Sequence, residues 1–143
     1  MRKAAIFLYF GVGIVSIILG LIYIFSPTFM PYHAVAIGRE WVELTTSEQI
    51  LFSALLDLAG AGWIAVGVAV ICLILIPARR GEIWARYLIP ALVFISYIPT
   101  LLATLSVLNA TPASPPWWGT MIVLIATMAA FLIDRPYSKD KGS

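Results

Sequence analysis

Asp57 is the one charged residue placed well inside an apolar stretch of this chain. Gln49 and Ser53 precede it at four-residue steps, which on a helix puts the three side chains along one face. A carboxylate in or near hydrocarbon is costly, and it can bind a cation, exchange a proton or orient the polar head of a ligand. We therefore predict a ligand or ion site on this face, turned toward protein or a cavity.

A structural role for Asp57 is the alternative. Its carboxylate could pair with Arg39 or His33 from the preceding loop, or accept hydrogen bonds from Ser53 and Thr104. Both interpretations stay open at the level of sequence.

Tyr97, Thr100 and Thr104 form a second polar group, within the third apolar stretch. Hydroxyl groups inside such a stretch bind either the backbone or a ligand. We expect them to lie opposite the face of Gln49, Ser53 and Asp57, where the two groups would enclose a site for a lipophilic ligand.

No metal or cofactor site is expected. His33 is the only histidine and Cys72 the only cysteine, so one chain cannot build a multi-histidine or multi-thiolate centre. His33 and Arg39 are kept as candidate residues of the outer loop. The chain also has no nucleotide-binding, hydrolase or zinc-protease motif.

Four apolar stretches position these residues. At a rise of 1.5 Å per residue, about 20 residues cross a hydrocarbon core of roughly 30 Å. Hydrophobic residues make up 62% of the 143 residues, which no soluble domain of this size could bury. We predict an all-α, polytopic membrane four-helix bundle that forms a single transmembrane domain over 1–143. The spans are expected at about 4–25, 48–76, 84–108 and 117–133, with an outer loop at 26–47.

Basic residues set the orientation, because Lys and Arg near span ends are retained on the cytoplasmic side. Eight of the nine lie before the first span, between the second and third, or after the fourth, and Arg39 is the ninth. We therefore expect a multi-pass inner-membrane protein with both termini in the cytoplasm. The topology accounts for the positive charge, so no nucleic-acid partner is expected.

Small residues predict where the helices pack. Ser16 and Gly20 form a small-xxx-small pair in the first span, and Ala61, Ala65 and Ala69 form a ridge in the second. A helix start is indicated by Thr45 with Glu48 and by Thr46 with Gln49, because both pairs match a capping box. The loop before it carries aromatic residues and is expected to fold back onto the membrane, either as a connection that rests at the interface or as a cover over the outer mouth of the bundle.

The span layout resembles a group of small bacterial four-span proteins called DoxX-like. The resemblance is carried by the glycine-spaced first span that ends at Ser26-Pro27, by the run from Leu56 to Trp63, and by the basic turn Pro77-Ala78-Arg79-Arg80. It implies a four-span fold, and it suggests a quinone-linked or lipid-modifying enzyme as one weaker alternative.

The leading hypothesis is a non-enzymatic membrane protein, surrounded by lipid, that binds a partner protein or a lipophilic small molecule within its helices. The number of small-residue faces also favours a homo-oligomer or a place in a larger membrane complex. The second hypothesis is an oligomeric transporter or channel that uses Asp57.

Overall fold

The computed structural model describes residues 1–136, and within them the chain is helical with no strand. Four helices are long and apolar enough to cross a membrane. They are α1 (Lys3–Phe25), α3 (Thr46–Leu73), α4 (Ile83–Ala110) and α5 (Trp117–Asp134), with α3 continued by the single π-helical segment η2 (Ile74–Ala78). The sequence predicted all four to within a few residues at each end.

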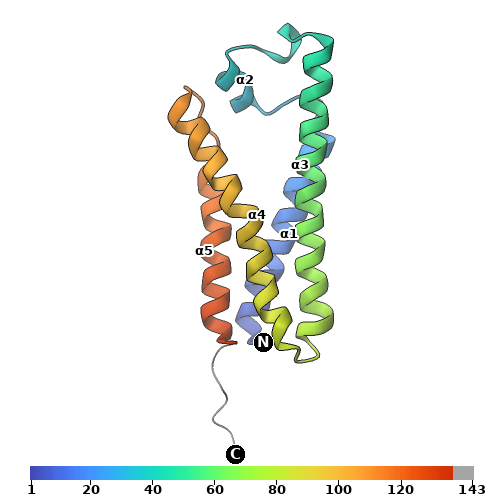
Figure 1. The fold of residues 1–143 in the computed structure, drawn as a ribbon, viewed down its shortest axis with the longest axis vertical. Coiled ribbons are helices and arrows are strands. Elements are labelled where there is room, and N and C mark those ends of the chain that lie inside the picture. The colour runs from blue at the N-terminus through green and yellow to red at the C-terminus, as the bar shows by residue number, and fades with distance from the viewer. Residues whose placement is uncertain (137–143) are drawn as a thin grey trace, which may run out of the picture.

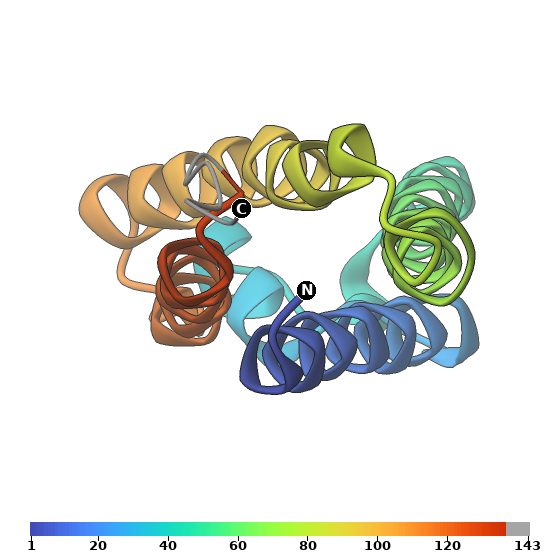
Figure 2. The same ribbon diagram turned by 90° about the horizontal axis from the view of Figure 1, so that it is seen from below.

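The four long helices stand in a ring in the order α1, α3, α4, α5 (Figure 2). The short helix α2 (Pro31–Ile37) and the 3-10 turn η1 (Trp41–Glu43) cross one end of the molecule (Figure 1). We call this the α2 end. The start of α1 and the end of α5 meet at the opposite end, which we call the Asp134 end.

Glycines hold α1 against α3. A Cβ atom built on Gly20 would lie 2.5 Å from the backbone oxygen of Gly60, and one built on Gly67 would lie 2.5 Å from the oxygen of Gly13. The two helices run antiparallel, and each contributes two glycines seven residues apart. Only hydrogen at these positions permits such a close approach of the backbones.

The predicted ridge of Ala61, Ala65 and Ala69 is not this contact. Ala61 and Ala65 are exposed and Ala69 is half-buried, whereas Gly60 and Gly67 on the neighbouring face are buried. A larger residue at Ala65 is therefore not expected to overpack the core. On α1 the prediction holds, because Ser16 and Gly20 are both buried.

A capping box and a small apolar cluster organise the α2 end. Of the two predicted capping boxes, that of Thr45 and Glu48 is confirmed, with the Glu48 backbone N–H donating to Thr45 Oγ1 and the Thr45 N–H donating to Glu48 Oε2. Phe29, Ala34 and Leu44 of the loop region pack against Leu56 of α3. The segment between α1 and α3 thus folds onto the ends of the long helices.

An ion pair joins three helices at the Asp134 end. Arg86 Nε donates to Asp134 Oδ2 at 2.7 Å, and the backbone N–H of Arg2 donates to Asp134 Oδ1 at 3.0 Å. The α-amino group of Met1 lies 4.0 Å from that same oxygen. Because the Asp134 side chain is only 1% exposed, these donors balance a charge that water does not reach.

The hydroxyl groups of Thr127 and Tyr9 are buried and have no hydrogen-bond partner within residues 1–136. In contrast, Ser16, Ser96 and Thr100 each donate to the carbonyl four residues earlier. A buried polar group left unpaired costs about 1–3 kcal/mol.

Thr127→Val should therefore raise stability, since valine keeps the shape of the side chain and removes the unpaired hydroxyl. We expect a gain of about 1 kcal/mol in the free energy of unfolding, measured by denaturation in mixed micelles. Thr104→Val is the control, because the Thr104 hydroxyl is already bonded and its removal should give no gain. A loss of stability in Thr127→Val would contradict the prediction.

Candidate ligand cavity

A cavity of about 300 Å³ lies among the four long helices, toward the α2 end. Each long helix and α2 contribute to its wall, together with the residue that precedes α5. The side chains that line it are apolar, aromatic or hydroxylated, and none is charged: Val15, Leu19, Tyr23, Tyr32, Trp63, Tyr97, Thr100, Thr104, Pro116, Trp118, Gly119 and Thr120.

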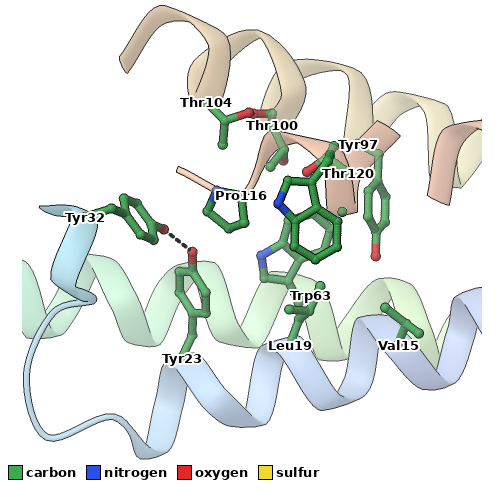
Figure 3. A pocket seen from close by; sticks show the side chains of 12 residues that line it. Val15, Leu19, Tyr23, Tyr32, Trp63, Tyr97, Thr100, Thr104, Pro116 and Thr120 are labelled. Atoms are coloured by element: carbon green, nitrogen blue, oxygen red, sulfur yellow. Dashed lines mark hydrogen bonds between the residues drawn. The ribbon is translucent and has the colours of Figure 1, made fainter. Parts of the chain in front are cut away.

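Two hydroxyl pairs lie at opposite ends of the cavity (Figure 3). Tyr23 and Tyr32 share a hydrogen bond of 2.8 Å, which links α1 to α2. At the other end, the hydroxyls of Tyr97 and Ser16 lie 2.7 Å apart. Ser16 already donates its hydrogen to the Val12 carbonyl, so Tyr97 donates to Ser16.

Aromatic packing fixes the wall on the α3 side. The rings of Trp63 and Tyr97 meet edge to face, with centroids 4.5 Å apart. Since Tyr97 is itself fixed by Ser16, the indole of Trp63 rests against an immobilised neighbour. The cavity is in this respect formed before any ligand arrives.

Hydroxyl groups on α4 turn their hydrogens toward the backbone. Thr100 donates to the carbonyl of Ser96, and Thr104 donates to those of Thr100 and Leu101. Their oxygen lone pairs remain available toward the cavity. The Thr120 hydroxyl makes no hydrogen bond within residues 1–136. Tyr23 and Tyr32 use only one of their two hydroxyl hydrogens in the bond between them, so the other is free to donate. The cavity therefore offers both donors and acceptors.

Half of the predicted site lies in this cavity. Tyr97, Thr100 and Thr104 come together in its wall, as the sequence suggested. Asp57 does not face them. It is exposed on the outside of α3, in a shallow hollow that it shares with Gln49 and Ser53.

The structural alternative for Asp57 is also wrong. Arg39 pairs with Glu48 at 2.7 Å, and His33 bonds to the backbone of Met30. Within residues 1–136 the Asp57 carboxylate has neither an ion pair nor a hydrogen bond. Hydrophobicity and helical spacing indicated its depth along α3, but they did not fix which way that face turns.

His33 helps to hold α2 in place. Its Nδ1 accepts a hydrogen bond from the Met30 backbone N–H at 3.2 Å, and its ring lies 4.2 Å from that of Tyr32. Burial lowers the pKa of His33, and burial with the Tyr23 hydrogen bond raises the pKa of Tyr32. Tyr32 therefore stays protonated, whereas His33 can respond to acid.

Acidification should loosen α2. Because the folded-state pKa of His33 lies below its ordinary value of 6.5, its stabilising effect is complete above about pH 6.5 and is lost as the pH falls through the folded value. We expect faster hydrogen exchange of the α2 amides at pH 5 than at pH 7.5, after correction for intrinsic rates. His33→Gln should remove that difference, and an equal pH effect in this variant would disprove the assignment to His33.

No group of three or more His, Cys, Asp or Glu residues close enough to hold a metal ion occurs in the part of the chain that the structure describes. The fold and cavity define a chain with four helices capable of crossing a membrane, arranged around an uncharged internal cavity. Comparison with protein-family models, curated proteins and solved structures gives no match.

Proposed function

We propose that this chain is a multi-pass inner-membrane protein that binds an uncharged lipophilic ligand in the cavity of a four-helix bundle, without catalysing a reaction. In this proposal both termini lie in the cytoplasm and the α2 end faces outward. The topology rests on the distribution of basic residues along the sequence: eight precede the first span, lie between the second and third, or follow the fourth, and the ninth, Arg39, lies between the first and second.

The observation that supports this proposal is the chemistry of the cavity wall. Aromatic rings provide an apolar surface, and six hydroxyl side chains provide polar contacts: Tyr23, Tyr32, Tyr97, Thr100, Thr104 and Thr120. A charged ligand would lose its hydration without gaining a counter-charge, which is unfavourable. An uncharged ligand with an apolar body meets no such penalty.

Gly119 allows the cavity to be filled by mutation. It lines the cavity, and a Cβ built on it meets nothing within 4 Å, so Gly119→Leu should be accommodated without a backbone clash. Gly11 is equally unobstructed but lies outside the cavity on α1. Gly11→Leu is therefore a matched control for adding the same side chain.

Photolabelling with 3-trifluoromethyl-3-phenyldiazirine, a compact uncharged probe, tests the proposal in phosphatidylcholine vesicles. We expect adducts on cavity residues such as Tyr97 in the unmodified chain and in Gly11→Leu. They should fall at least about tenfold in Gly119→Leu, which corresponds to about 1.4 kcal/mol of binding free energy. Adducts confined to exposed faces, or equal labelling of Tyr97 in Gly119→Leu, would refute binding in the cavity.

A transport pathway through Asp57 has less support. Asp57 lies outside the cavity wall, and the hollow that contains it is lined from α3 and the segment before it. Such a pathway would need another chain to complete it.

A further inference from the structure

A second hollow adjoins the ligand cavity. It has a volume of about 280 Å³ and opens on the side of the molecule between α3 and α4. Trp63 and Thr100 line both spaces, so the Trp63 indole forms part of the wall between them. Figure 1 shows α4 diverging from α3 toward the α2 end, which leaves room for this side opening.

Small side chains leave space on the α3 side of the opening. Ala59 and Gly62 line it and are exposed, and a Cβ built on Gly62 meets nothing within 4 Å. Val66 continues the apolar wall, while α4 contributes Ser96 and Thr100. The opening therefore presents a mainly apolar surface to whatever surrounds the helices.

The cavity alone suits only a small ligand. At about 300 Å³ it is at the lower limit of the roughly 300–1,000 Å³ found for small-molecule sites. A longer molecule fits only if part of it leaves the cavity. The α3–α4 opening is directly adjacent, and its wall favours hydrocarbon over a polar group.

We infer that the ligand is an uncharged lipid whose hydroxyl or carbonyl head binds among the cavity hydroxyls and whose hydrocarbon tail passes Trp63 and leaves between α3 and α4. This inference rests on the proposed function and adds the class and orientation of the ligand. The head finds hydrogen-bond donors and acceptors without any charged partner, and the tail reaches the bilayer without crossing water.

Gly62→Leu separates the tail from the head. The added side chain fills the side opening and leaves the cavity wall unchanged, because Gly62 lines only the opening. The probe is hexadecanol that carries a photoactivatable diazirine either beside the hydroxyl or near the middle of the tail. The full chain is used in phosphatidylcholine vesicles.

In the unmodified chain, we expect the diazirine beside the hydroxyl to label Tyr97 or Thr120 and the diazirine in the tail to label Val66 or Ser96, which line the side opening and neither of the other two spaces. Gly62→Leu should lower hexadecanol labelling at least tenfold and leave labelling by the compact phenyldiazirine unchanged. Hexadecyl phosphate and hexadecyltrimethylammonium, which carry the same tail on a charged head, should compete at least tenfold less well than unlabelled hexadecanol.

Three results would overturn the inference while leaving the proposed function standing. They are undiminished hexadecanol labelling in Gly62→Leu, tail adducts at Phe52 or Leu55 of a neighbouring hollow, and equal competition by a charged amphiphile. If instead neither probe labels the cavity, the proposed function itself fails. Retained phenyldiazirine labelling of Gly62→Leu shows that this variant is folded.

Discussion

Gly20→Val should separate α1 from α3 and lower the free energy of unfolding by about 3 kcal/mol, the upper part of the usual range for overpacking. The new Cβ would lie 2.5 Å from the Gly60 carbonyl oxygen and 2.9 Å from the backbone nitrogen of Ile64. Backbone atoms cannot rotate away as a side chain can, so α3 itself must move. Denaturation in mixed micelles measures the loss.

Gly11→Ala and Gly62→Ala are matched controls, one on each helix. Both positions are open, and replacing a helical glycine by alanine favours the helix by up to about 1 kcal/mol. Neither variant should be less stable than the unmodified chain. If Gly20→Val were as stable as these controls, α1 and α3 would not meet at Gly20 and Gly60.

Asp134→Asn should be the second severe substitution, with a loss of about 3 kcal/mol, the lower end of the range for breaking a buried ion pair. The amide keeps the size of the side chain but removes the charge that balances Arg86, whose own side chain is 20% exposed. The Arg86 guanidinium also donates to the Asp134 backbone carbonyl at 3.0 Å, so it stays close to the altered side chain. The same denaturation assay applies.

Removing both charges tests whether the loss comes from the unpaired arginine. The double variant Asp134→Asn with Arg86→Gln should be more stable than Asp134→Asn alone. Glu48→Gln is the exposed comparison and should change stability only slightly, because its pair with Arg39 lies in solvent. A double variant no better than the single one would locate the loss elsewhere.

Helix positions were predictable from the sequence, whereas the contact faces were only partly so. Apolar length and the Thr45 capping box specify where α3 lies along the chain. Its small residues occupy two neighbouring faces, and the alanine face was the wrong choice. The glycine spacing offered a better signal, because Gly13 and Gly20 on α1 match Gly60 and Gly67 on α3 at the same seven-residue interval.

The candidate site could likewise be predicted only in part, because sequence spacing groups residues within one helix but does not show which helices meet. Tyr97, Thr100 and Thr104 share one helix, so their grouping follows from local spacing. Trp63, Tyr23 and Thr120 come from three other helices, and only the packing brings them to the cavity. The sequence did contain a periodic pattern that places polar residues on one face of each of two helices. Tyr9, Ser16 and Tyr23 recur every seven residues on α1, and Thr120, Thr127 and Asp134 do so on α5.

The ion pair at Asp134 also bears on the order of assembly during synthesis. The glycines that join α1 to α3 have all been synthesised once residue 67 is added. Arg86, in contrast, can pair only after Asp134 has been added, 48 residues further along the chain at the end of α5. Because chains emerge from the N-terminus, the α1–α3 pair can form first and the ring closes last. A chain that stops before residue 134 therefore leaves Arg86 without this partner, and the contact between α4 and α5 at this end cannot form.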